Sequence, residues 1–297
     1  MLVAIAAFFL LYDFPDTASF LTIEERAWVV HRLKYQGSVG SGRAVAESER
    51  FKWSHVRAAF ADWQIYVGLL VSQPRNIFYL YLLLKMYWGI VCPLYGISLF
   101  LPTIINGLGY FSSTAQLLTV PIYVTAAILT VIVAYYADRS PKIGRAPFIF
   151  LPMLAILVGF IMALAGSAHG GVPGVVYAGV FIATCGIYPA FPGNVTWMSN
   201  NLAGSYKRSV GMAIHIGLGN LGGAMASNFY RMADGPKYIL GHSLEIGFVF
   251  VGLCAVVVLR TTYRGINAKR ERMGSEGGTD AEMSELGDKA PTFRYML

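Results

Sequence analysis

The stretch NNLAGSYKRSVGMAIHIGLGNLGGAMASNFYRMADGPKYILGH, residues 200–242, joins a short basic loop to an apolar helix of membrane length. Inside that apolar run lie His215, Asn220 and Asn228. Hydrocarbon penalises a polar group that has no hydrogen-bond partner by several kcal/mol, so these side chains need a water-filled cavity or a partner helix. The pattern therefore predicts a helix that lines a polar pathway through a membrane rather than one that faces lipid.

The composition of the whole chain agrees with a membrane protein. Of its 297 residues, 56% are hydrophobic and only 13% are charged, and the mean hydropathy is +0.54. A helix needs roughly 20 apolar residues to cross the hydrocarbon, and such runs predict six spans, at residues 86–103, 115–136, 148–167, 175–197, 210–229 and 244–259. The expected fold is an all-α multi-pass membrane protein with six transmembrane helices. Residues 1–12 are apolar over too short a length and are interpreted as the remnant of a preceding transmembrane helix.

The positions of lysine and arginine predict the orientation of these spans. The formal charge is +7, and the basic residues gather in residues 26–57, 139–145, 207–208 and 260–294. Cytoplasmic loops carry an excess of Lys and Arg. Six crossings with both ends in the cytoplasm satisfy that rule, so the C-terminus is expected to be cytoplasmic. Nucleic acid is not expected as a partner, because the charge is explained by topology.

Three segments are expected to depart from the six regular spans. Residues 13–63 predict a cytoplasmic loop with amphipathic helices, the first of them capped by Thr22 and Glu25 and ending near Lys34. Residues 64–260 form the predicted six-helix transmembrane half, in which residues 71–85 are a possible insertion because the first apolar run is too long for one crossing. Residues 261–297 predict a disordered cytoplasmic tail from their Glu, Gly and Ser content.

Polar and aromatic residues within the spans are the candidates for substrate binding. His215 lies well inside a span, where proton coupling and a neutral, hydrogen-bonded structural role are equally supported. Residues 188–197 contain two prolines and a glycine, which free backbone carbonyls and allow the helix to bend. Such broken helices often line substrate sites. The predicted substrate-binding residues are Tyr95, Tyr188, Asn194, Trp197, His215 and Asn220.

Charged residues at the cytoplasmic ends of the spans are interpreted separately. They can hold the topology or act in gating, and they comprise Asp138, Arg139, Arg145, Lys207 and Arg208. Glu245 falls at an outer end of the last span, and no acidic residue falls at the middle of any span. A carboxylate proton relay is therefore expected elsewhere.

Two motif-like patterns are better explained by packing than by chemistry. Gly217, Gly219 and Gly222 match a dinucleotide-binding fingerprint by spacing, but that motif requires a preceding strand. In an apolar helix the same glycines predict a stripe for close packing of a neighbouring helix, and so does the spacing by multiples of four of Gly211, Gly219, Gly223 and Ser227. The three cysteines lie in separate spans without paired spacing, so neither a metal site nor a disulfide is expected. No cofactor and no enzymatic activity are expected, because the spans contain no nucleophile elbow and no paired carboxylates.

Several motifs carry a resemblance to a known family. They are DFPDTASFLTIEER (13–26), YGISLFLPTIINGLGY (95–110), YYADRSPKIGR (135–145), NNLAGSYKR (200–208) and GNLGGAMASNFYRMADGPKYILGH (219–242). In these stretches the chain resembles the C-terminal half of a major facilitator superfamily transporter, most closely the fungal allantoate permease family of anion:cation symporters. The YYADRSPKIGR stretch resembles the second copy of that superfamily's charged loop.

The resemblance implies a function. It implies proton-coupled transport of a small organic anion, such as a carboxylate, ureide or vitamin, by alternating access of two six-helix halves. The expected partners are the substrate, the proton, the lipid bilayer and the missing N-terminal six-helix half, and the expected location is the plasma membrane. The alternative is a non-transporting, truncated membrane protein that pairs with or regulates another transporter.

Overall fold

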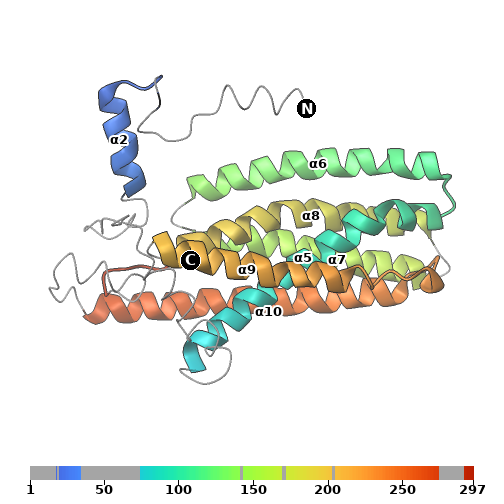
Figure 1. Ribbon diagram of the computed structural model, residues 1–297. Coiled ribbons are helices and arrows are strands. Elements are labelled where there is room, and N and C mark those ends of the chain that lie inside the picture. The colour runs from blue at the N-terminus through green and yellow to red at the C-terminus, as the bar shows by residue number, and fades with distance from the viewer. Residues whose placement is uncertain are drawn as a thin grey trace.

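The computed structural model describes residues 18, 20–34, 74–140, 143–168, 172–202, 205–273 and 291–297. Over these residues the chain is helical and contains no strand. The long helices between residues 74 and 273 form a bundle in which one, at residues 74–107, crosses the others obliquely, and the short helix at residues 23–34 lies apart from them (Figure 1). The elements are α2 (Ile23–Lys34), α5 (Pro74–Gly107), α6 (Ser112–Arg139), α7 (Ala146–Ala168), α8 (Pro173–Asn200), α9 (Ser205–Ala226), the 3₁₀ turn η3 (Met232–Asp234) and α10 (Ile239–Met273).

Five of the described helices are long and apolar enough to cross a membrane. They are Lys85–Gly107 within α5, Ser112–Arg139, Ala146–Ala168, Pro173–Asn200 and Ile239–Arg272. The sixth predicted span, residues 210–229, coincides largely with α9, which is not among the five. Glycines, Asn220 and His215 lower the apolar character of α9. Five spans therefore agree with the prediction, and a sixth crossing by α9 stays a prediction.

Glycines set the closest helix crossings in the bundle. A Cβ added to Gly159 of α7 would lie 2.5 Å from the carbonyl oxygen of Gly179 in α8. A Cβ added to Gly89 of α5 would lie 2.9 Å from the Cα of Gly252 in α10. Backbones can approach this closely only where a side chain is missing, which is the usual basis of tight packing between membrane helices. These two crossings place α7 against α8 and α5 against α10.

The glycine stripe of α9 packs as predicted, and its partner is α5. Gly219, Gly222 and Gly223 lie directly beneath aromatic rings of α5. The indole Nε1 of Trp88 also donates a hydrogen bond of 3.2 Å to the carbonyl oxygen of Leu218. The interpretation as a packing stripe is therefore confirmed at these three glycines, whereas a Cβ on Gly217 would meet no atom within 4 Å.

The capping box predicted for the first amphipathic helix is present. The backbone N–H of Thr22 donates to Oε2 of Glu25 at 3.0 Å, and the backbone N–H of Glu25 donates to Oγ1 of Thr22 at 3.3 Å. The first of these bonds lowers the pKa of Glu25 below its usual value, because it stabilises the carboxylate form. Helix α2 then runs from Ile23 to Lys34, as the sequence predicts.

The C-terminal residues depart from the prediction of a disordered tail beginning at residue 261. Helix α10 continues to Met273, and its last turn carries Arg270 and Arg272, which suit the negative end of the helix dipole. Residues 291–297, which we call the tail, lie against the ends of three helices. The Leu297 carbonyl oxygen accepts a hydrogen bond of 3.3 Å from the N–H of Ala146, at the start of α7. The prediction used average composition, which carries no information about these specific contacts.

Two predicted boundaries involve residues that the structure describes only in part. Helix α5 starts at Pro74, so most of the possible insertion at residues 71–85 belongs to a helix that continues into the first span. This continuity does not test whether the segment is an insertion. Residues 1–12, most of 13–63 and residues 274–290 lie outside the described part of the chain, so the calls on them stay predictions.

Candidate functional site

A group of hydroxyl and amide side chains meets where α5, α8 and α9 come together. The Tyr95 hydroxyl on α5 donates to Oδ1 of Asn220 on α9 at 3.4 Å. One turn further along α5, the Ser98 hydroxyl lies 3.5 Å from the hydroxyl of Tyr188 on α8. Tyr123 of α6 packs edge-on against Tyr188, with ring centroids 5.8 Å apart and planes at 87°. We call these five residues the polar face.

The polar face is open within this chain. Tyr95, Ser98 and Asn220 are exposed, and Tyr123 and Tyr188 are partly exposed. None of the five side chains carries a charge at neutral pH, yet together they offer four hydroxyls, one amide and three aromatic rings. Such a surface can bind a small planar polar solute by donating hydrogen bonds to it and by stacking on it. It brings together Tyr95, Tyr188 and Asn220, three of the predicted binding residues.

His215 lies elsewhere, in the packed interface between α9 and α5. It is 1% exposed, and its ring packs edge-on against Tyr87 with centroids 4.5 Å apart. Neither ring nitrogen has a hydrogen-bond partner within the described residues. A structural role through hydrogen bonds between helices therefore finds no partner in this part of the chain. The histidine is buried behind the aromatic side chains of α5 rather than on the polar face.

Asn194 and Trp197 of α8 are both fully buried and do not belong to the polar face. Neither Nδ2 nor Oδ1 of Asn194 has a hydrogen-bond partner within the described part of the chain. The indole Nε1 of Trp197 donates to the carbonyl oxygen of Met296 at 2.8 Å, and its ring packs edge-on against Tyr263. Trp197 therefore lies away from the polar face, with its only polar side-chain atom bonded to the tail, and its role as a cavity residue stays a prediction.

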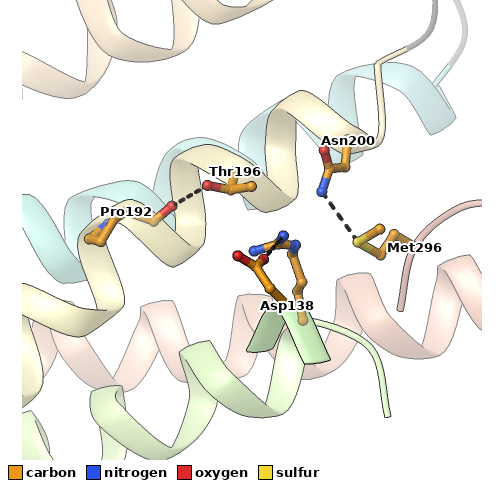
Figure 2. A network of polar contacts seen from close by, with 6 residues as sticks. Asp138, Pro192, Thr196, Asn200 and Met296 are labelled. Carbon is orange, nitrogen blue, oxygen red and sulfur yellow. Dashed lines mark hydrogen bonds and ion pairs between the residues drawn. The ribbon is translucent and has the colours of Figure 1, made fainter. Parts of the chain in front are cut away.

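The charged residues predicted for gating gather at the tail end of the bundle, where residues 138–145 and 291–297 lie. Asp138 and Arg145 form an ion pair across the turn between α6 and α7. The Arg139 guanidinium lies 4.4 Å from the centroid of Tyr135, and Arg208 Nε donates to the carbonyl oxygen of Leu202 at 3.1 Å. Figure 2 shows Asp138 in its ion pair and Asn200 pointing toward Met296.

The side chain of Lys207 lies outside the described part of the structure. The other predicted gating residues are therefore grouped at one end, where Asp138 and Arg145 form an ion pair.

A second polar cluster lies near the opposite end, where α5 ends and α10 begins, and the sequence analysis missed it. Glu245 and His242 of α10 are both 0% exposed, and Tyr230, which precedes η3, is 3% exposed. The Tyr230 hydroxyl lies 3.3 Å from Nδ1 of His242. Glu245 lies near the start of α10, as the sequence predicts, and it is buried because α5 covers it. The sequence does contain a signal for this cluster, because a three-residue spacing puts His242 and Glu245 on one helix face.

Comparison with known proteins gives a consistent result for the whole chain. An uncharacterized transporter of Schizosaccharomyces pombe is 33% identical over 293 residues, which are 97% of this chain and 52% of the relative. The chain is similar to fungal transporters of the major facilitator type. The high-affinity nicotinic acid transporter of Saccharomyces cerevisiae is 29% identical over 281 residues, or 93% of this chain and 48% of that protein.

A further relative, the MFS transporter prlL of a fungal species, is 29% identical over 280 residues, or 92% of this chain and 51% of that protein. No family model matches the chain. The chain spans about half the length of the curated relatives that it matches. Together with the five apolar helices, these relatives show a multi-pass membrane protein related to transporters.

Proposed function

We propose that this chain is the C-terminal half of a major facilitator transporter of the allantoate permease family, which moves a small organic anion together with a proton. The observation that carries the proposal is the polar face, because hydroxyl and amide groups converge there from α5, α8 and α9. Such donors can bind a carboxylate, a ureide or a vitamin without a fixed charge. One relative is a transporter of nicotinic acid, which is a small aromatic carboxylate.

The polar face needs a second group of helices to cover it before it can form an enclosed binding site. Exposed polar groups in the middle of a membrane are costly unless they line a cavity, so a partner should cover them. We propose that a six-helix N-terminal half lies against this face and that the two halves rock around it. In this arrangement Tyr95, Tyr188 and Asn220 contact substrate, whereas His215 and Asn194 lie one layer behind them.

We propose that the transporter lies in the plasma membrane and that the tail end of the bundle faces the cytoplasm. The concentration of Lys and Arg near residues 139–145, 207–208 and 260–294 supports that orientation. Opening toward the cytoplasm would then require movement around the Asp138–Arg145 pair, so the predicted gating residues belong to the inner gate.

Uptake of labelled nicotinate tests the proposal. The chain would be expressed in yeast that lack nicotinate uptake, alone and together with the N-terminal half of the Schizosaccharomyces pombe relative. A panel of other carboxylates and ureides would be run in parallel, in acidic and in neutral medium. We expect saturable uptake, stronger in acidic medium, when both halves are present. Membrane insertion without uptake of any compound would instead favour a non-transporting partner or regulator.

Substitutions on the polar face make the test specific. Tyr95→Phe removes the hydroxyl that reaches Asn220, and Asn220→Ala removes the acceptor, so each should weaken apparent substrate affinity. Tyr136→Phe is the matched control, because it deletes a hydroxyl from an exposed tyrosine at the tail end of α6. Equal effects of Tyr95→Phe and Tyr136→Phe on uptake would argue against the polar face as the binding site.

A further inference from the structure

Glu245 is a buried acidic side chain within a membrane-spanning helix. It is 0% exposed, and neither carboxyl oxygen has a hydrogen-bond partner within the described part of the chain. An ionisable residue at such a position is expensive and usually functional. The site described above makes no use of it.

Helix α5 leaves room for the Glu245 carboxyl. A Cβ added to Gly96 would overlap Oε1 of Glu245, and it would lie 3.2 Å from the ring of Tyr230. Gly96 therefore provides the space in which the carboxyl and the tyrosine meet. Gly96 follows Tyr95 in the sequence, so the Glu245 carboxyl packs against the turn of α5 that also carries Tyr95.

Two other ionisable groups, on Tyr230 and His242, lie near this position toward the start of α10. His242 lies on the same face as Glu245 and is fully buried, and its Nδ1 is 3.3 Å from the Tyr230 hydroxyl. Nε2 of His242 has no partner among the described residues. Phe160 of α7 and Phe100 of α5 pack against these two rings, with centroid distances of 6.0 Å and 5.4 Å respectively. The cluster therefore combines exchangeable protons with an apolar enclosure.

The surroundings of Glu245 decide its charge in this conformation. The ionisable groups that interact with it are Tyr230 and, from α5, the Cys92 thiol. His242 faces it from α10 itself, and α7 contains no ionisable residue between Ala146 and Ala168. None of these neighbours is a fixed positive charge, and a buried carboxylate without one costs several kcal/mol. The packed conformation therefore favours the neutral carboxylic acid.

We propose that Glu245 is the proton-carrying group of this half, loaded through His242 and Tyr230 from the end of the bundle where α10 begins. On loading, a proton from solvent forms an O–H bond with the carboxylate. On release, that O–H bond breaks, the proton passes to water and the carboxylate remains, which requires α5 and α10 to separate enough for water to enter. The proposal rests on the proposed function only for its role in coupling. The loading site itself is a property of this chain.

The loading site is tested by infrared spectroscopy of the purified full chain in lipid nanodiscs. The C=O stretch of a protonated carboxyl is separated from that of a carboxylate, and it shifts in D₂O. We expect a protonated-carboxyl band at neutral pH in the wild type, and loss of that band in Glu245→Gln. Glu271→Gln is the matched control, because it makes the same change at an exposed position of α10 and should leave the band in place. Persistence of the band in Glu245→Gln, or its absence from the wild type, would overturn the loading site.

Coupling is tested by transport with both halves present. Glu245→Gln should lose accumulation driven by a pH gradient and keep substrate exchange across the membrane, because the glutamine mimics the loaded form. Tyr230→Phe keeps the ring but lacks the hydroxyl, so it should shift the pH profile of uptake. Equal loss of accumulation and exchange, or unchanged accumulation, in Glu245→Gln would refute the coupling role. Absence of uptake in the wild type would refute the proposed function instead, and with it the coupling role, while the infrared result would still decide the loading site.

Discussion

Replacement of Asn267 by alanine should release the tail from the end of α10. The Asn267 side chain pairs with the backbone of Tyr295 in both directions: Nδ2 donates to the carbonyl oxygen at 2.7 Å, and Oδ1 accepts from the N–H at 2.9 Å. Asn201, which follows α8, forms the same two-way pair with Met296, at 3.2 Å and 2.7 Å. Two asparagines therefore hold consecutive tail residues from two different helices.

The loss of docking free energy can be worked out from the hydrogen bonds that the substitution removes. Each hydrogen bond contributes about 1 kcal/mol net, so Asn267→Ala should weaken tail docking by about 2 kcal/mol. Since every 1.4 kcal/mol is tenfold, local opening should become about 30-fold more frequent. The Tyr263–Tyr295 stack, with centroids 4.6 Å apart and planes at 5°, remains in the variant and keeps part of the docking energy.

Amide hydrogen exchange of the peptide covering residues 291–297 measures this opening directly. Exchange of the Met296 amide, whose acceptor on Asn201 is unchanged, should accelerate by about 30-fold in Asn267→Ala, because exchange proceeds through the locally open form. Asn267→Asp keeps the acceptor and loses the donor, so its effect should be smaller. Asn106→Ala is the control, because its amide bonds the Tyr110 carbonyl at the opposite end of the bundle. Unchanged exchange of the Met296 amide in Asn267→Ala would refute this docking of the tail.

Three further predictions concern other parts of the chain. Gly159→Ala should lower the free energy of unfolding by about 1–3 kcal/mol, because its Cβ would meet the α8 backbone. Gly217→Ala is the control and should not destabilise the protein, because a Cβ there meets no atom. Equal melting temperatures of the two variants would contradict this prediction. Thr22→Ala removes the hydroxyl that donates to Oε2 of Glu25 at 2.9 Å and keeps the backbone N–H bond, so it should raise the pKa of Glu25 part of the way toward its usual value, as NMR titration would show. The capping contribution is present above the unfolded pKa of Glu25 and is lost as pH falls through its lowered folded pKa; an unshifted titration in Thr22→Ala would contradict this. His215→Ala should reduce uptake or move its pH optimum when both halves are present; unchanged uptake across acidic and neutral pH would remove His215 from the mechanism.

Local patterns in the sequence predicted much of the helical framework. The capping box of Thr22 and Glu25 is a contact between residues three apart, so its spacing alone predicted the start of α2. The glycines of α9 gave the packing stripe because residues three and four apart share a helix face. Membrane crossing depends on the summed hydropathy of a segment, which explains why five spans were found at the predicted positions.

The candidate site was predictable only in part. Three of the predicted residues, Tyr95, Tyr188 and Asn220, lie on the polar face. The sequence did not indicate that Tyr123 of α6 would pack against Tyr188 there. Trp197 was chosen for its position beside prolines, and its actual partner is the Met296 carbonyl, 99 positions away. Residue type and spacing indicate which side chains could enter a site, whereas the neighbour across the interface decides which of them do.

The sequence by itself determined that this chain is helical, apolar enough for a membrane and organised in segments of membrane length. These properties follow from the composition and periodicity of neighbouring residues. Only the tertiary structure decided that Glu245 is buried against Gly96, that His215 lies behind the rings of α5, and that the tail is held by Asn201 and Asn267. Burial and hydrogen bonding at these positions come from the packing of segments far apart in the chain, and local hydropathy carries no information about which helix covers which side chain.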